Sequence, residues 1–217
     1  INLKMADYEK REYNLPVSLY CDNRLFLDGY KMMQIYQPIY QEMTNIPETD
    51  CADITNRLDD RVPNDNIEQV YADCLKLQTI PPNISYTNGA GMLKWNNLTN
   101  FACNCPELVT VDFQAAYFKD DNNDKQFNRM FYNCPKLLEI TPFELSEYSD
   151  STGTVYFNQA FKGDTAYKTG LNYIRSSRDL YMEECFAECK SIVTAPKIET
   201  ANGSMYMTKA FSNCSKL

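Results

Sequence analysis

The sequence predicts a repeat solenoid of the α/β class, in which short strands and helical turns stack side by side behind a small α+β segment at the N-terminus. Three observations favour this class. One pattern of apolar residues recurs six times between residues 63 and 217. Two apolar side chains in each copy are spaced for one face of a helical turn, and a short β-branched stretch follows. Internal repetition at such a period is typical of solenoids.

The repeat is defined by an anchor position that carries cysteine in five of its six copies. The anchors are Cys74, Cys105, Cys134, Asp164, Cys189 and Cys214, with spacings of 31, 29, 30, 25 and 25 residues. Positions within a copy are numbered below from this anchor, which is position 0. The last copy ends at position +3, so we expect it to be incomplete and the chain to be part of a longer protein.

Large apolar side chains recur on both sides of the anchor. Position −7 holds Ile67, Leu98, Phe127, Phe157, Met182 and Met207, and position −3 holds Tyr71, Ala102, Phe131, Phe161, Phe186 and Phe211. Position +3 holds Leu77, Leu108, Leu137, Tyr167, Ile192 and Leu217. Positions four residues apart share one face of a helix, so we expect a helical turn from −7 to −3.

The stretches that follow the anchors are short and end at proline or turn residues. They include KLQTIPP, ELVTVDF, KLLEITPF and SIVTAPKI, which are typical of strands. A single unit of turn, strand and loop cannot bury its own apolar side, so the copies are expected to stack with parallel strands. Each buried Leu, Phe or Met contributes roughly 1.5–3 kcal/mol, which makes stacking the main source of stability.

The cysteines are expected to be buried free thiols, because cysteine behaves as a small apolar side chain between Phe and Leu. Cys185 and Cys189 are four residues apart, but a zinc site needs four ligands and the chain contains no histidine. Asp164 replaces cysteine in one copy, and with Gly163 before it we expect a capped turn there. No metal and no cofactor are predicted.

Composition disfavours several classes of function. The net charge is −8 and the Lys and Arg residues form no cluster, which disfavours nucleic acid as a partner. No apolar run approaches the roughly 20 residues of a membrane-spanning helix, so no membrane insertion is expected. The absence of histidine removes the commonest general base and every Ser-His or Cys-His nucleophile, so no catalytic residues are predicted. Adjacent acidic pairs such as Glu183-Glu184 are interpreted as solvated charge, and we expect a protein that is not an enzyme.

The DDNNDK segment at 120–125 has alternating oxygen side chains, as in calcium loops. An EF-hand requires Gly at its sixth position and Glu at its twelfth, where this chain has Lys125 and Phe131. The segment is therefore interpreted as a loop between repeats. Residues 1–62 carry no anchor, and we expect them to form a separate cap or docking segment for the solenoid at 63–217.

The repeat pattern resembles a known family. Met-x-x-Ala/Cys-Phe-x-x-Cys-x-x-Leu/Ile at Met182–Ile192 and Met207–Leu217, with RMFYNCPKLLEI at Arg129–Ile140, is similar to the BspA-like leucine-rich repeats of bacterial surface proteins, which have relatives in phages and some protists. The resemblance covers about residues 63–217. It implies a leucine-rich-repeat-like fold and a role as a non-enzymatic adhesin or interaction module.

Tyr156, Tyr181 and Tyr206 lie 25 residues apart within TVYFN, DLYME and SMYMT. If these triplets are extended, alternation directs each tyrosine away from its core-facing neighbours, and stacking aligns the rings in a row. Such a row suits recognition of a sugar or a protein surface. The alternative is a ladder of rings that stabilises the stack and binds nothing.

Two functions remain open from these observations. The first is an interaction module that binds a protein or glycan through a repeat-lined face of a longer, surface-displayed protein. The second is a structural component of a phage virion, in the tail or on the capsid, whose partners are neighbouring subunits. The printed sequence shows no signal peptide at Ile1, and we expect the cell surface or a virion as the location.

Overall fold

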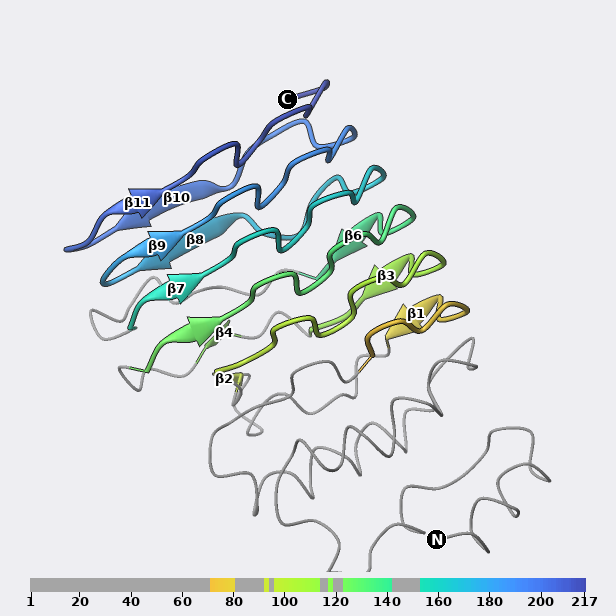
Figure 1. Ribbon diagram of the computed structural model, residues 1–217, viewed down its shortest axis with the longest axis horizontal. Helices are drawn as coiled ribbons and strands as arrows, with labels where there is room; N and C mark the ends of the chain where they lie inside the picture. The colour runs from red at the N-terminus through yellow and green to blue at the C-terminus, as the bar shows by residue number, and fades with distance from the viewer. Residues whose placement is uncertain (1–70, 81–91, 94–95, 114–116, 119–122, 142–152) are drawn as a thin grey trace, which may run out of the picture.

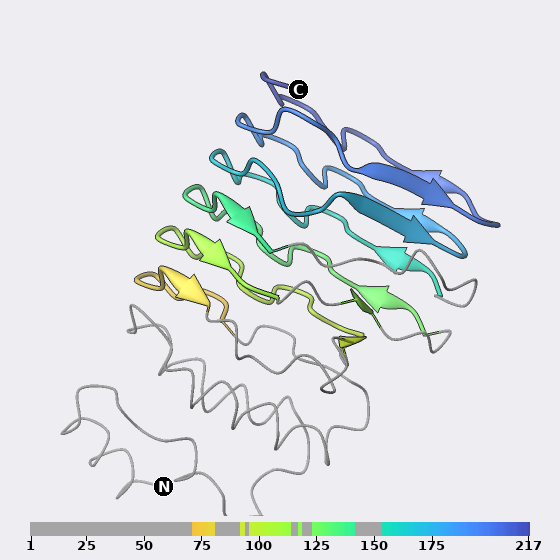
Figure 2. The same cartoon turned by 180° about the vertical axis from the view of Figure 1, so that it is seen from behind.

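A computed structural model describes residues 71–80, 92–93, 96–113, 117–118, 123–141 and 153–217. These residues form a parallel β-solenoid in which each successive repeat lies on the one before it (Figures 1 and 2). Each repeat is called a coil below and is identified by its anchor. The solenoid expected from the repeat is therefore confirmed. The expected cap at 1–62 lies outside the described residues.

Strands of consecutive coils pair in parallel on two sides of the stack. One sheet contains β1 (Thr79–Ile80), β3 (Thr110–Val111) and β6 (Glu139–Ile140), and a second contains β5 (Lys125–Gln126), β7 (Val155–Tyr156), β9 (Leu180–Tyr181) and β11 (Met205–Tyr206). Two further pairs join β2 (Met92–Leu93) to β4 (Tyr117–Phe118) and β8 (Tyr173–Ser176) to β10 (Lys197–Thr200).

The register of these sheets follows the repeat. Ile80 pairs with Val111 and Val111 with Ile140, so residues at one repeat position become neighbours in space. Tyr156 likewise pairs with Tyr181 and Tyr181 with Tyr206. A side chain that recurs in the sequence therefore forms a column along the solenoid axis.

The expected helical turns are wrong, and so is the α/β class for this part of the chain: the described residues form strands and turns and no helix. Residues from −7 to 0 form consecutive β-turns, as in the bonds from Met130 N to Phe127 O and from Tyr132 N to Arg129 O, both 3.2 Å. Backbone φ is positive at −5 and −1 in coil after coil, as at Arg129 (54°) and Asn133 (60°). A residue in the left-handed region cannot continue a right-handed helix, which explains the difference.

The turns also carry hydrogen bonds from each coil to the next. In the Cys134 coil the alternate amides of Phe127, Arg129, Phe131 and Asn133 donate to carbonyls of the Asp164 coil at 2.7–2.9 Å. The same positions donate in the neighbouring coils, for example Phe161 N to Cys185 O at 2.8 Å. This turn ladder satisfies backbone groups that would otherwise be buried without partners, and it links coils where no strand is assigned.

A column of aromatic rings fills the core between the two sheets. Its members, with centroids 5.1–6.0 Å apart from ring to ring, are Tyr71, Phe101, Phe131, Phe161, Phe186 and Phe211. All of them are buried except Phe211, which is partly buried. Phe101 stands at −4 and replaces the aromatic side chain that Ala102 lacks at −3, so the column is continuous where the sequence pattern has a gap.

Within the described residues, each of the four stretches predicted as strands contains a strand, at a common position in three coils and later in the Cys189 coil. β1, β3 and β6 occupy the predicted positions, whereas the Asp164 coil continues this sheet by a single bridge from Glu139 to Thr169. In the Cys189 coil only the end of the predicted stretch at 191–198 is a strand, since β10 begins at Lys197. Gly170 and Ala195 stand where the first three coils have Ile or Val, so these two coils lack the β-branched residue that favours a strand.

The positive φ values give a test of the turn ladder. Glu188 is exposed and has φ of 68°. We predict that Glu188→Val lowers the free energy of unfolding by about 1–2 kcal/mol, because a β-branched residue is strained in this region, whereas Glu188→Gly leaves it unchanged or slightly raised. Urea unfolding followed by circular dichroism measures both. Glu183→Val makes the same chemical change at an exposed position without positive φ, and an equal loss there would contradict the account.

Candidate functional site

Tyr156, Tyr181 and Tyr206 form a row on the outer side of the four-stranded sheet. Ring centroids are 5.0 Å apart between Tyr156 and Tyr181 and 4.5 Å apart between Tyr181 and Tyr206, with interplanar angles of 7° and 8°. Val155 and Leu180, which precede the first two tyrosines, are buried, as alternation along a strand requires. Tyr156 and Tyr181 are half-buried and Tyr206 is 46% exposed.

Parallel stacking decides which part of each ring is available. The faces of Tyr181 lie against Tyr156 on one side and Tyr206 on the other, so the row presents ring edges and hydroxyl groups more than flat faces. Shielding from water by the neighbouring rings, and then the Tyr206 hydroxyl, raise the pKa of Tyr181, which keeps its hydroxyl a neutral donor and acceptor. The three tyrosines are therefore a ladder of stacked rings, and their outer edges form an accessible line of polar groups.

Polar side chains flank this row in two further columns. Ser204 N donates to Asp179 Oδ1 at 2.8 Å, and Thr154 N donates to Asp124 Oδ1 at 2.8 Å. On the other side Glu183 N donates to Asn158 Oδ1 at 2.9 Å. These bonds use one oxygen of each side chain and fix its direction. The three tyrosines with Asn158, Asp179 and Glu183 are called the tyrosine face below.

The cysteine column lies inside the solenoid. Cys74, Cys105, Cys134 and Cys189 are buried, Cys214 is half-buried, and all five are free thiols. Each thiol from the second coil on donates to the carbonyl at −3 of the preceding coil, at 3.0 Å in every case: Cys105 to Tyr71, Cys134 to Ala102, Cys189 to Phe161 and Cys214 to Phe186. Burial raises the pKa of Cys134, Cys185 and Cys189, so these thiols stay protonated and unreactive.

Asp164 continues the cysteine column, and its side chain is completely buried. Its Oδ1 accepts the Cys134 amide at 2.7 Å, while Oδ2 is without a hydrogen-bond partner among the described residues. Burial raises the pKa of this carboxyl well above its usual range. The expected capped turn is therefore replaced by a buried acid in the core, although Gly163 does adopt a positive φ of 87°.

Within the described ranges no group of three or more Cys, Asp or Glu side chains is arranged to hold a metal ion. Residues 120–122 of the acidic 120–125 segment lie outside those ranges, and its last residue, Lys125, is buried in β5. No helix in the described part of the chain is long and apolar enough to cross a membrane. Comparisons with known protein families, curated proteins and solved structures find no match to this chain.

Sequence reasoning missed the polar columns beside the tyrosines. Asn158 and Asp179 stand two residues from a tyrosine, which is the spacing that places side chains on the same side of an extended strand. The signal was present in the alternation, but each copy carries a different residue there. Glu183 was interpreted only as solvated charge, whereas its amide is bonded to Asn158.

The buried acid predicts a pH dependence of stability. A carboxyl whose pKa is raised in the folded state retains its full contribution below the pKa of the unfolded chain, about 3.9, and loses it as the pH rises through the folded pKa. We predict that Asp164→Cys raises the free energy of unfolding at pH 7 by about 1–3 kcal/mol, because it removes an unsatisfied buried group and restores a thiol that can donate to Phe131 O.

The difference between Asp164→Cys and the parent chain should shrink as the pH falls from the raised folded pKa of Asp164 toward about 4, and should stay constant at lower pH. Urea titrations from acidic to neutral pH measure it. Glu139→Gln removes an exposed carboxylate and should change the unfolding free energy at pH 7 by less than about 0.5 kcal/mol. A parent chain that is equally or more stable than Asp164→Cys at neutral pH would contradict the prediction.

Proposed function

We propose that this chain is a non-enzymatic interaction module that binds a protein or glycan partner through the tyrosine face. One observation carries the proposal: three tyrosines held in register by paired strands expose a continuous line of ring edges and hydroxyls at a spacing of 4.5–5.0 Å. Tyrosine contributes large contact area with little loss of side-chain entropy, which suits recognition surfaces.

The charge of the face limits the partner. Asp179 and Glu183 flank Tyr181, and Thr154, Asn158 and Ser204 are uncharged. A polyanionic ligand would be repelled by these carboxylates, whereas a neutral glycan or a basic protein surface would not. Rigid rings between fixed polar groups also reduce the entropy lost on binding.

The wider identity of the protein is part of the same proposal. The repeat pattern supports membership of the BspA-like group, whose proteins are mostly surface-displayed adhesins. A second candidate, a structural component of a phage virion, is favoured by one observation: every cysteine among the described residues is an unpaired thiol. Unpaired thiols are usual in proteins that assemble in a reducing compartment.

Replacing all three tyrosines tests the proposal. The probes are a glycan array and an array of extracellular-matrix proteins, to which the fluorescently labelled chain is applied. We predict that the parent chain binds some members and that Tyr156→Ala/Tyr181→Ala/Tyr206→Ala weakens binding by at least about tenfold, equivalent to 1.4 kcal/mol. Tyr156→Phe/Tyr181→Phe/Tyr206→Phe keeps the stacking and isolates the contribution of the hydroxyls.

A matched control changes the other sheet. Thr79→Ala/Thr110→Ala/Glu139→Ala alters three residues that share position +5 outside the tyrosine face, and it should bind like the parent chain. Circular dichroism checks that every variant is folded. Binding that survives the triple alanine change, or a parent chain that binds nothing on either array, would refute the tyrosine face as the site.

A further inference from the structure

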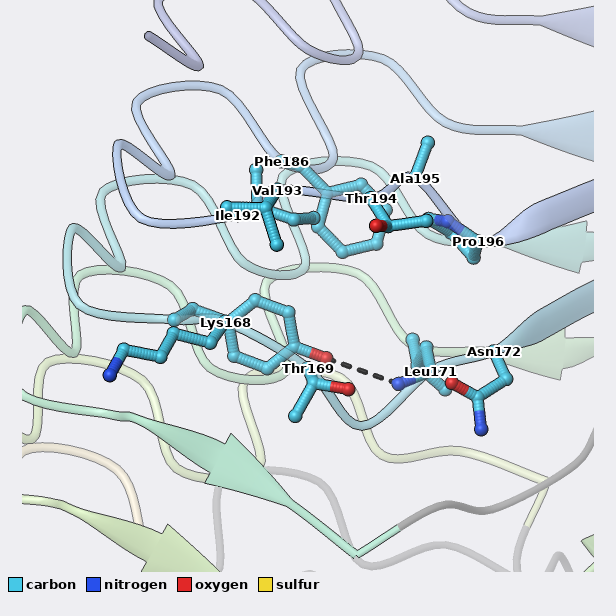
Figure 3. Close-up of a pocket in the computed structure, with 11 residues that line it drawn as sticks. Lys168, Thr169, Leu171, Asn172, Phe186, Ile192, Val193, Thr194, Ala195 and Pro196 are labelled. Carbon is cyan, nitrogen blue, oxygen red and sulfur yellow. Dashed lines mark hydrogen bonds between the residues drawn. The ribbon is translucent and has the colours of Figure 1, made fainter. Parts of the chain in front are cut away.

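A cavity of about 190 Å³ opens between the Asp164 and Cys189 coils. Its lining comes from two facing segments, 167–172 and 192–196, with Phe186 behind them (Figure 3). None of these residues belongs to the tyrosine face. The cavity lies where the three-stranded sheet ends, since that sheet reaches Thr169 only through a single bridge.

The cavity exists because the backbone ladder is interrupted there. Lys168 N donates to Leu138 O at 2.9 Å, which joins the Asp164 coil to the Cys134 coil. Lys197 N donates to Asn172 O at 2.9 Å, which joins the Cys189 coil to the Asp164 coil. Between these two bonds, no hydrogen bond links residues 168–171 to residues 192–195 in the described structure. The two segments therefore lie next to each other without the backbone pairing that joins the coils elsewhere.

The sequence explains the interruption. Position +6 holds Ile80, Val111 and Ile140 in the first three coils, and then Gly170 and Ala195. Gly170 has φ of 142° and lies so close to Ile140 that an added Cβ would be 2.4 Å from Ile140 O. The glycine draws its segment toward the preceding coil, and the space that an aliphatic side chain would fill in the next gap stays open.

The lining has an aromatic and an apolar part. The buried rings of Tyr167 and Phe186 lie 6.2 Å apart at an interplanar angle of 24°. Tyr167 Oη accepts the Leu171 amide at 3.2 Å and retains its own proton for a second hydrogen bond. Stacking on Phe161 and Phe211 covers both faces of Phe186, so the apolar contacts open to a ligand come from exposed uncharged side chains such as Val193 and Ala195.

A second part of the lining is polar and, apart from Lys168, uncharged. Thr169, Asn172 and Thr194 contribute hydroxyl and amide groups. No carboxylate lines the cavity, and Lys168 is its single charged side chain. Figure 3 shows that the Lys168 ammonium extends away from Thr194 and Asn172, and this side chain is exposed. The cavity therefore offers apolar contacts on one part of its lining and uncharged hydrogen-bonding groups on another.

We propose that this cavity binds a compact, uncharged ring molecule that carries hydroxyl or acetamido groups, the class of a single sugar residue. Sugars combine an apolar C–H face, which packs on the aliphatic side chains of Val193 and Ala195, with hydroxyls that pair with Thr169, Thr194 and Asn172. The volume is smaller than the roughly 300–1,000 Å³ of drug-sized sites, so it accommodates one ring and excludes an oligosaccharide chain. The site is independent of the tyrosine face.

The test is a titration of the ¹⁵N-labelled chain followed by amide NMR signals. The probes are N-acetyl-D-glucosamine, N-acetyl-D-galactosamine and methyl β-D-glucoside, with phenol as an apolar ring of similar shape. We predict that at least one sugar binds in the millimolar range and shifts the amide signals of residues 168–172 and 192–195. Thr169→Ala/Asn172→Ala, which removes two exposed polar groups, should weaken binding by about tenfold.

Two tryptophan variants separate a blocked cavity from an altered surface. Val193 lines the cavity and is 62% exposed, and Leu138 occupies the same position, +4, in an earlier coil that does not line it. Val193→Trp should abolish sugar binding, whereas Leu138→Trp and the triple tyrosine variant should bind like the parent chain. Melting temperatures verify that each variant is folded.

Three outcomes would overturn the inference. If no sugar shifts the amide signals of the parent chain, the cavity is a solvent-filled gap and not a binding site. Binding of phenol but of no sugar would show that the cavity takes apolar rings and is not a sugar site. Sugar binding that Val193→Trp retains but the triple tyrosine variant loses would place the site on the tyrosine face, which would support the proposed function and refute the cavity.

Discussion

The structure depends on backbone hydrogen bonds that run from each coil to the next, through the turns as well as the strands. The assigned strands in the described residues are two to four residues long, too short to hold a stack together by themselves. The turn ladder extends the pairing from β5 through Asn133, with donors at every second residue. Alternate amides that point along the axis require the alternating backbone that positive φ at −5 and −1 provides.

The side chains of the core fit the spacing between coils that this ladder sets. A thiol at the anchor is small enough for the space between successive coils, and it donates to the carbonyl at −3 of the coil before. Asp164 fits the same space but brings a carboxyl that burial makes costly to ionise, so this coil is the point at which pH acts on stability. Both the ring column and the tyrosine face follow from the same one-coil register.

Much of the solenoid could be predicted from the sequence, because its core positions repeat with the chain. Regular spacing in the sequence marks the anchors and the apolar positions on either side of them. It also marks the three tyrosine triplets. The spacing could not distinguish the turns from a helical turn, since residues at −7 and −3 are four apart in both. Position −1 did carry a signal that was missed, because five of its six residues are Asn, Asp or Gly, which favour positive φ, whereas the residues at −5 share no type. The substitution of Phe101 for Ala102 was hidden because it shifts the ring by one residue. The only trace of the cavity in the sequence is Gly170 and Ala195 at a position that is otherwise Ile or Val. Its polar lining could not be predicted, because it depends on where the backbone hydrogen bonds between coils are interrupted.

Amide hydrogen exchange at Arg129, Phe131 and Asn133 tests the turn ladder most directly, because these residues lie in turns that would normally exchange fast. Their amides donate to Asn158, Ala160 and Lys162 of the next coil at 2.8–2.9 Å. The account predicts that they exchange as slowly as Phe127, next to β5, through openings close to global unfolding in free energy. Exchange at the rate of an ordinary surface loop, with Phe127 still protected, would show that the coils are joined only at their strands and would contradict it.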